Sequence, residues 1–199
     1  MYTKIVHRKH RGTKLIFFSF SFALFFIIVY YLYRHYDELF LTRTNYQQLI
    51  EEAAIRHDMS PLLLKAVIWQ ESRFKANIVG SHKEIGLMQI RPNYGAVTDW
   101  EKEHNQKIKC KGILFNPELN IEIGAWYLGR ALKRWNTYKH HKELALSEYN
   151  AGLKGMRPWI PSEREGKVIS RITIPSTKEY VSGIIRKYNE YKAEDPYKK

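Results

Sequence analysis

Two helix starts are marked in this 199-residue chain by a capping residue directly before a proline. Ser60 precedes Pro61 and Asn116 precedes Pro117, and proline suits the first helical position because the N–H that it lacks has no partner there. Apolar residues follow each pair at the three- and four-residue spacing of one helix face. No stretch alternates like a strand for more than a few residues, although residues 167–174 could form a short extended piece. The pattern predicts a mainly α fold.

Five segments carry this helical pattern, and polar or irregular stretches separate them. Gly152 should end one of the helices, because glycine commonly follows the last helical residue. Ser176 and Glu179 have the spacing of a capping box, which should start the last helix. The predicted helices cover residues 45–58, 61–72, 117–135, 141–152 and 176–192.

An uncharged apolar run occupies residues 15–33, and at 1.5 Å per residue it would span most of a hydrocarbon core about 30 Å thick. A cleaved signal peptide is the alternative, but the run is long for one and no small-residue cleavage site follows it. We expect one uncleaved N-terminal transmembrane helix. Residues 1–14 contain five Lys and Arg residues and no acid, so they should stay in the cytoplasm.

This orientation places the rest of the chain outside the cytoplasmic membrane, facing the periplasm or cell wall. We expect a linker over residues 34–44, a helical domain over 45–192 and a short tail over 193–199. Of the net charge of +13, five charges precede the apolar run and eight belong to the remainder. A basic domain in that compartment favours an anionic envelope polymer or the outer membrane face as its neighbour, rather than nucleic acid.

Glu71 stands where the second helical pattern ends. The negative end of the helix dipole and the apolar face formed by Leu63, Leu64 and Val67 would both raise the pKa of its carboxyl group. A neutral carboxylic acid held in this way could protonate a leaving oxygen, such as that of a glycosidic bond. From its position alone, however, Glu71 is more readily interpreted as an ordinary solvated glutamate than as a catalytic acid, because exposed glutamates are common.

Five short motifs occur in an order that changes this balance. Together they resemble the lytic transglycosylase domain of soluble and membrane-bound murein-degrading enzymes, which is related in fold to goose-type lysozyme. The resemblance covers about residues 45–190. The motifs are ES (71–72), GLMQI (86–90), NIEIGAWYL (120–128), YNAG (149–152) and YV (180–181).

The resemblance implies a lysozyme-like domain that cleaves the β-1,4 bond between N-acetylmuramic acid and N-acetylglucosamine in peptidoglycan. It implies that Glu71 is the single acid and base, and that the muramoyl C6 hydroxyl closes a 1,6-anhydro ring in place of water. Tyr149 would orient the carboxyl group. The residues that would line the sugar groove are Met88, Gln89, Asn150, Tyr180 and Ser81, with Met88 equally compatible with the core.

The chain departs from the family pattern near this groove. Gly80 stands where the family often has a serine, so that Ser81 would have to replace its contact with the substrate. The carboxylates of Asp58, Glu84, Asp99 and Glu148 are expected at the surface, with Glu148 facing solvent.

Two other functions share these features: a lysozyme-type hydrolase on the same fold, and a non-catalytic scaffold that binds the wall. The mechanism requires no cofactor or metal, and the single cysteine, Cys110, excludes an intramolecular disulfide and a cysteine-based zinc site. The expected partners are peptidoglycan strands and the membrane, without nucleic acid. Envelope or secretion machinery is left open as a partner.

Overall fold

The computed structural model describes residues 24–30, 46–108 and 110–195. The chain divides into two compact units, Met1–Asn45 and Tyr46–Lys199. In the first unit residues 24–30 are helical and expose their apolar side chains. The remainder of the expected anchor over 15–33, the tail over 1–14 and the linker over 34–44 lie outside the described residues. Within the described ranges, no helix is long and apolar enough to cross a membrane.

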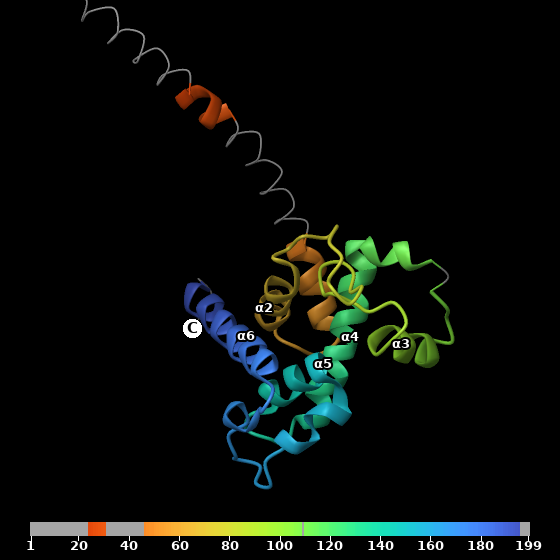
Figure 1. The fold of residues 1–199 in the computed structure, drawn as a ribbon, viewed down its shortest axis with the longest axis vertical. Helices are drawn as coiled ribbons and strands as arrows, with labels where there is room; N and C mark the ends of the chain where they lie inside the picture. The colour runs from red at the N-terminus through yellow and green to blue at the C-terminus, as the bar shows by residue number, and fades with distance from the viewer. Residues whose placement is uncertain (1–23, 31–45, 109, 196–199) are drawn as a thin grey trace, which may run out of the picture. The chain divides into compact units, whose positions relative to one another are not determined.

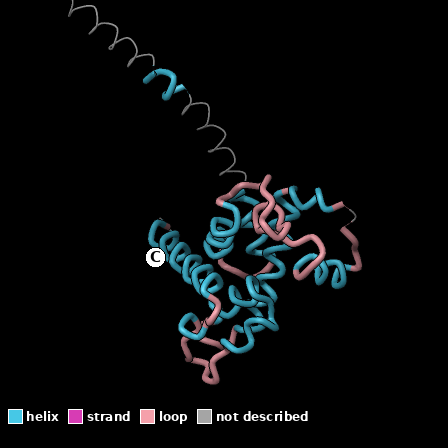
Figure 2. Tube along the Cα trace, in the orientation of Figure 1, coloured by secondary structure: helices cyan, strands magenta, loops and turns pink. Residues whose placement is uncertain are grey.

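The second unit is built from helices joined by loops (Figure 1). Its described backbone contains isolated β-bridges but no strand, and Figure 2 shows helix and loop throughout. The mainly α fold is thus confirmed. After a helical segment over residues 46–56, the elements are α2 Pro61–Ser72, α3 Ala96–His104, η1 Lys111–Phe115, α4 Pro117–Trp135, α5 His141–Met156, η2 Arg157–Trp159, η3 Ile169–Arg171 and α6 Pro175–Glu194.

Proline stands at the start of three of these helices. In α4 the Asn116 side chain accepts a hydrogen bond from the Leu119 amide at 3.0 Å, as its capping position predicts. Ser60 precedes α2 at the expected place, but its side chain caps nothing. The predicted capping box at Ser176 is wrong, because α6 begins one residue earlier with Pro175 at its first position.

Three further details differ from the sequence prediction. Gly152 interrupts α5 at the predicted place, because its φ of 72° and ψ of 158° are not helical, but a second helical stretch carries α5 on to Met156. Residues 169–171 form the 3-10 helix η3 where a short extended piece was expected. Helix α3 was not predicted, because only Ala96 and Val97 of its nine residues are buried and the apolar pattern is therefore weak.

The core lies between two helix pairs, with α4 packed mainly on α5, and α2 mainly on α6. Ile121, Ala125 and Leu128 of α4 are buried as predicted, and so are Leu64 and Val67 of α2. A fully buried leucine or valine side chain contributes about 1.5–3 kcal/mol to stability. This packing fixes the end of α2, where Glu71 lies, against α6.

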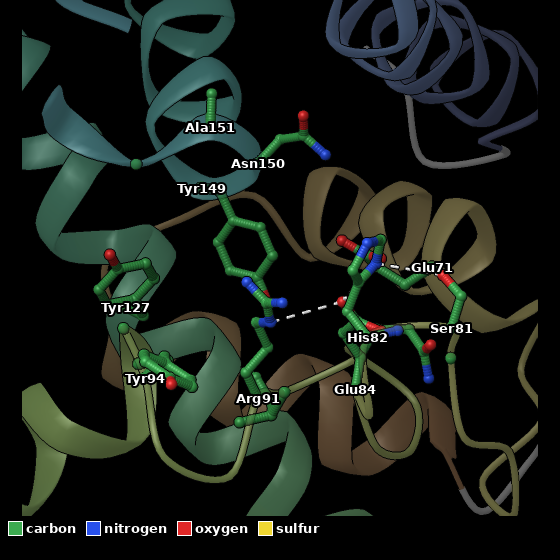
Figure 3. Close-up of a pocket in the computed structure, with 16 residues that line it drawn as sticks. Glu71, Ser81, His82, Glu84, Arg91, Tyr94, Tyr127, Tyr149, Asn150 and Ala151 are labelled. Carbon is green, nitrogen blue, oxygen red and sulfur yellow. Dashed lines mark hydrogen bonds and ion pairs between the residues drawn. The ribbon is translucent and has the colours of Figure 1, made fainter. Parts of the chain in front are cut away.

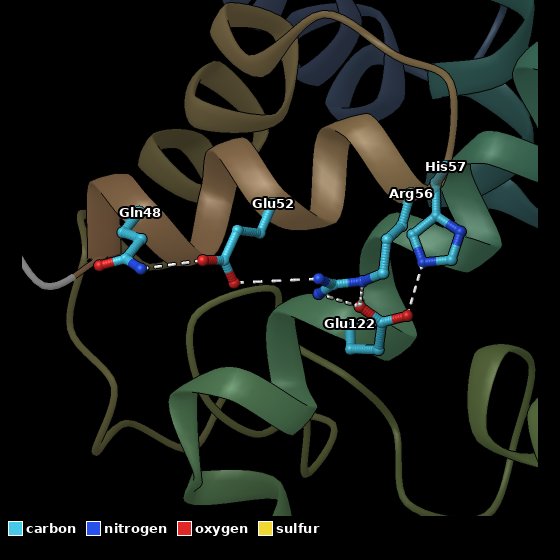
Figure 4. Close-up of polar contacts among 5 residues, drawn as sticks. All are labelled: Gln48, Glu52, Arg56, His57 and Glu122. Carbon is cyan, nitrogen blue, oxygen red and sulfur yellow. Dashed lines mark hydrogen bonds and ion pairs between the residues drawn. The ribbon is translucent and has the colours of Figure 1, made fainter.

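A polar network joins the 46–56 segment to α4 (Figure 4). Arg56 Nη2 donates to Glu122 Oε2 at 2.7 Å, and His57 Nε2 lies 2.7 Å from Glu122 Oε1. Burial would raise the pKa of Glu122, but the hydrogen bonds from His57 and Arg56 outweigh burial and lower it. Arg56 and His57 are thus both engaged in contacts with Glu122.

Glu148 does not face solvent, contrary to the sequence prediction. It is 5% exposed and lies on the face of α5 that packs on α4. Its carboxylate accepts a hydrogen bond from Trp135 Nε1 at 2.7 Å and lies 3.3 Å from Arg134 Nε. Burial of this carboxylate is compensated because both α4 groups satisfy it.

Candidate active site

The GLMQI motif forms a tight turn that a buried asparagine on α4 holds in place. Asn120 Oδ1 accepts from the Met88 amide at 2.8 Å, while its Nδ2 donates to the carbonyls of Ile85 and Leu114 at 2.9 and 2.8 Å. Gly86 has a φ of 78°, and a Cβ atom at this residue would lie only 2.6 Å from Asn120 Nδ2. The glycine of the motif is therefore required by both backbone conformation and space.

Met88 and Gln89 are adjacent in this turn but point to different surroundings. Met88 is 0% exposed, and a Cβ atom on Gly124 would overlap its sulfur. Its side chain belongs to the core, which corrects its inclusion among the groove residues. Gln89 has a φ of 47° and lines the pocket, and its Nε2 donates to the Gly86 carbonyl at 2.9 Å.

Glu71 lies in the last turn of α2, which Arg73 ends in a left-handed conformation with φ of 53°. Its side chain is half-buried and borders the pocket shown in Figure 3. Tyr180 of α6 donates a hydrogen bond from its hydroxyl to Glu71 Oε1 at 2.6 Å. The pairing of α2 with α6 thus brings together two residues that are 109 positions apart.

Burial dominates the electrostatics of Glu71. Desolvation raises the pKa of its carboxyl group from 4.5 to about 7, the hydrogen bond from Tyr180 opposes this increase, and the nearby charge of Glu84 adds to it. Burial, followed by the Glu71 charge, also raises the pKa of Tyr149 and of Tyr180 well above the ordinary value. Both phenols therefore act as neutral hydrogen-bond donors. The charge of Glu71 is thus coupled to Glu84 and to these two tyrosines.

The hydroxyl groups of the two tyrosines make different contacts in the structure. Tyr180 contacts the Glu71 carboxyl group directly, whereas the Tyr149 hydroxyl donates to the Met88 carbonyl at 3.0 Å. Tyr149 thus ties α5 to the GLMQI turn and presents its ring to the pocket. Tyr180 is 8% exposed and is not among the residues that line the pocket.

The pocket has a volume of about 490 Å³ and lies between the end of α2, the loop over residues 80–91, the start of α3, the middle of α4 and the second half of α5. Four of the predicted site residues border it together with Glu71. Asn150 also accepts a hydrogen bond from the Thr177 hydroxyl at 2.8 Å, which links α5 to α6. These four are Ser81, Gln89, Tyr149 and Asn150.

Glu84 also lines this pocket, although we expected it at the surface. Its Oε2 accepts from the His82 amide at 2.9 Å, and its Oε1 lies 3.5 Å from Arg91 Nε. In Figure 3 the dashed line that starts at Arg91 marks its approach to this carboxylate. A second carboxylate therefore borders the pocket, and its orientation is fixed by a backbone amide and an arginine.

The ends of two flexible side chains fill the space beside Gly80, where the resemblance suggested a serine. A Cβ atom on Gly80 would lie 2.5 Å from Glu84 Oε2 and 2.6 Å from Gln89 Oε1. These two side chains occupy the place that a serine would need. Ser81 is exposed at the pocket, and its hydroxyl lies 3.1 Å from His82 Nδ1.

Sequence reasoning missed other residues of the pocket. Arg91 and Tyr94 directly follow the GLMQI turn, so their closeness to this motif was the available signal. Tyr127 lies within the NIEIGAWYL motif and stacks edge-on with Tyr149, the ring centroids being 5.8 Å apart. None of the three carries a spacing pattern of its own, and the fold is needed to bring them together.

A helical domain that holds a half-buried glutamic acid at a helix end, beside an open pocket, has the architecture of lysozyme-like proteins. The transglycosylase SLT domain family matches residues 48–171, which is more than half of the chain. The chain belongs to this family, as the motifs predicted.

Three relatives illustrate the likeness in sequence. The X polypeptide of Escherichia coli is 30% identical over 102 residues, which cover 49% of this chain and 55% of the relative. A soluble lytic murein transglycosylase of Salmonella typhimurium is 27% identical over 166 residues, covering 80% of this chain and 24% of that protein. A lysozyme g of Takifugu rubripes is 29% identical over 154 residues, covering 70% of this chain and 76% of that protein. The chain thus spans about half of the X polypeptide and a quarter of the soluble enzyme.

Solved structures show the same fold. The lytic transglycosylase Slt of Pseudomonas aeruginosa, determined as an inactive mutant, superposes with a TM-score of 0.65 at 22% identity and covers 76% of this chain and 26% of that one. A complex of a 70-kDa soluble lytic transglycosylase with bulgecin A superposes with a TM-score of 0.63 at 25% identity, covering 75% of this chain and 25% of that one.

Proposed function

We propose that this protein is a peptidoglycan lytic transglycosylase and that Glu71 is its acid and base. The observation that carries the proposal is the half-buried Glu71 carboxyl group beside the pocket, with its pKa raised to about 7 by burial. A group with this pKa is protonated in about half of the molecules at neutral pH, so it can both donate and accept a proton there. The family match and the names of the relatives support the substrate.

The reaction requires one carboxyl group to act twice. Protonated Glu71 donates its proton to the oxygen of the glycosidic bond between N-acetylmuramic acid and N-acetylglucosamine as the bond to C1 breaks. The ionised carboxylate then takes the proton from the muramoyl C6 hydroxyl, whose oxygen bonds to C1 and closes the 1,6-anhydro ring. The proton returns to Glu71, so the enzyme is regenerated without water. Tyr180 holds the carboxylate in position between the two transfers.

Hydrolysis is the second candidate, and Glu84 is the observation that favours it. Glycosidases that use water generally employ two carboxyl groups, one as the acid and one as a nucleophile or base. Glu84 lines the same pocket as Glu71, and a lysozyme g is among the relatives. Both Glu84 oxygens are already engaged, one by the ion pair with Arg91 and one by the hydrogen bond from the His82 amide. This argues that Glu84 is a fixed charge beside Glu71 rather than a second catalytic carboxyl group.

Mass spectrometry of digested sacculi tests the proposal. We expect muramoyl ends in the 1,6-anhydro form, which are one water lighter than reducing ends. Reducing ends would identify a hydrolase. Intact sacculi would leave a non-catalytic wall-binding scaffold as the remaining candidate function. The Glu71→Gln variant should remain folded and lose activity by a factor on the order of 10²–10⁴, the usual contribution of a general acid. Cleavage by this variant at the wild-type rate would overturn the role of Glu71.

We also propose that the domain works outside the cytoplasmic membrane and is tethered by residues 15–33. The support is the uncharged run with basic residues before it, together with relatives named as membrane-bound lytic murein transglycosylases. Protease treatment of spheroplasts tests this placement. We expect the full-length protein to sediment with membranes and to lose its domain to external protease. Release into the soluble fraction by osmotic shock would contradict the tether.

A further inference from the structure

A second and larger pocket opens at the other end of α2 from Glu71. Its volume is about 700 Å³, and its walls come from residues 56–60, the start of α2, the second half of α4, the start of α5 and α6. Ser60 and Leu63 border it at α2, and Trp126 and Tyr188 contribute aromatic rings. We call this the basic pocket. Leu63 and Glu71 are eight residues apart on α2, or about 12 Å along the helix axis.

The lining of the basic pocket is strongly positive. It contains two arginines, two lysines and two histidines, and its only acidic residue is Asp58. The pocket beside Glu71, by contrast, is lined by Glu71 and Glu84 with Arg91 and His82. An excess of one charge sign in a concave site concentrates ligands of the opposite sign.

Partners within the protein already engage the two arginines. Arg56 donates two hydrogen bonds to Glu122, and Arg130 lies 3.4 Å from Asp99. Arg130 also lies over the Trp126 ring, 4.7 Å from its centroid. Planar guanidinium groups can bind a phosphate in bidentate fashion, but both of these are engaged by groups of the protein itself.

The two lysines have no such engagement. Among the described residues, neither Lys133 nor Lys142 has an acidic partner within ion-pair distance. Lys142 instead lies 3.3 Å from His141 Nε2 and 6.0 Å from the centroid of the Tyr188 ring. Lys192 lies on the same ring at 5.5 Å. The charge that the protein leaves unmatched at this pocket is thus that of two lysine ammonium groups, of which Lys142 lies beside the Tyr188 ring.

We propose that the basic pocket is a second binding site, which takes a free carboxylate of a peptide carried by the glycan strand. This inference rests on the proposed function, since peptidoglycan is the polymer that would bring such carboxylates to the domain. A carboxylate suits two ammonium point charges, and the Tyr188 ring offers an apolar surface for the peptide that carries it. Binding here, away from the scissile bond, would hold the strand while Glu71 acts.

Binding to intact sacculi tests the site without turnover. The full-length chain with Glu71→Gln serves as the parent, and Lys133→Glu with Lys142→Glu is compared with the matched pair Lys102→Glu and Lys167→Glu. Both control lysines are exposed and line neither pocket. Co-sedimentation at low salt should show about tenfold weaker binding for the pocket pair than for the control pair, because two favourable charge contacts become repulsive. Thermal unfolding verifies that both proteins are folded.

A second arm identifies the anion. Sacculi whose carboxylates have been converted to amides should bind the pocket pair and the control pair equally. Equal binding of the two pairs to untreated sacculi would overturn the site, and a difference that persists after amidation would overturn the carboxylate as its ligand. Failure of wild-type protein to cleave sacculi would count against the proposed function alone, because the binding comparison uses no turnover.

Discussion

The Tyr180 hydroxyl lies 2.6 Å from Glu71 Oε1 and joins α6 to the last turn of α2. Hydrogen bonding to the ionised carboxylate favours it and so lowers the pKa of Glu71, against the larger effect of burial. The bond therefore positions the acid and also limits how far its pKa rises. These two effects can be separated by substitution.

Replacing Tyr180 with phenylalanine should raise the pKa of Glu71 above about 7. Since the proposed reaction requires the protonated form of Glu71, the alkaline limb of the pH profile of kcat/KM should move to higher pH. The maximal rate should fall by about ten- to a hundredfold, because a hydrogen bond to a charged group contributes about 1.5–3 kcal/mol. Initial rates on solubilised glycan strands between pH 4 and 9 give both values.

Tyr149→Phe is the matched control, because this hydroxyl donates to the Met88 carbonyl and not to Glu71. We expect the midpoint of the alkaline limb to stay in place and stability to fall by about 1 kcal/mol. An alkaline limb that moves with Tyr149→Phe and stays with Tyr180→Phe would return the positioning role to Tyr149.

The raised pKa of Glu71 also predicts how stability depends on pH. The carboxyl group has an ordinary pKa of 4.5 when unfolded and about 7 when folded. Between these values the folded state binds more protons, so stability falls as pH rises, and the full cost is present above pH 7. A shift of this size corresponds to a cost of about 3 kcal/mol.

Glu71→Gln removes this ionisation and should therefore stabilise the fold at pH 8 but hardly at pH 4. Urea unfolding of both proteins at the two pH values measures the difference. Glu163→Gln is a control, since this exposed glutamate lies outside both pockets. An equal effect of Glu71→Gln at pH 4 and pH 8 would contradict burial of the charge.

Periodicity and caps were enough to predict the α4 start at Pro117 and the placement of Glu71 at the end of α2. They could not predict α3, which rests only a small apolar face on the core. Nor could they predict the direction of Glu148, because the pairing of α4 with α5 decides which face of α5 is buried.

The motifs predicted which residues surround the acid but not which of them touches it. Tyr149 and Tyr180 both lie in motifs, and only the packing of α6 on α2 puts the second hydroxyl on Glu71. Glu84 lies outside the five motifs, so none of them assigned it to the pocket. Its place depends on the left-handed residues Lys83 and Gly86 on either side.

Glu84→Gln should move the alkaline limb to lower pH, because the charge of Glu84 contributes to the raised pKa of Glu71. The same variant separates the two candidate reactions. In a lytic transglycosylase the products keep anhydro ends and the rate changes modestly. In a hydrolase that uses Glu84 as its second carboxyl group, the rate should collapse at every pH. Product mass spectra and the pH profile are recorded on the same samples, with Glu163→Gln as the control.

Placing a serine at Gly80 tests whether the loop could accept the more common residue of the family. The new side chain would meet Glu84 Oε2 and Gln89 Oε1, which must move away. We expect Gly80→Ser to raise KM, because Glu84 and Gln89 must move within the pocket, and to change stability little, because only the ends of these two flexible side chains have to shift. Ser81→Ala, which adds no atoms, should raise KM without loss of stability. Higher activity of Gly80→Ser would show that the loop rearranges freely.

Asn120 should be the most sensitive polar residue beneath the site. It is 0% exposed and makes three hydrogen bonds to the backbone that surrounds the GLMQI turn. Asn120→Ala leaves the buried Met88 N–H and the Leu114 carbonyl without these partners, whereas the Ile85 carbonyl still accepts from the Ile90 amide at 2.9 Å. Each unsatisfied group costs about 1–3 kcal/mol, so urea unfolding should show a loss of at least about 2 kcal/mol. Asn150→Ala, at an exposed residue with one hydrogen bond from Thr177, should cost about 1 kcal/mol or less. Equal losses for the two variants would mean that the turn is held by its own backbone rather than by α4.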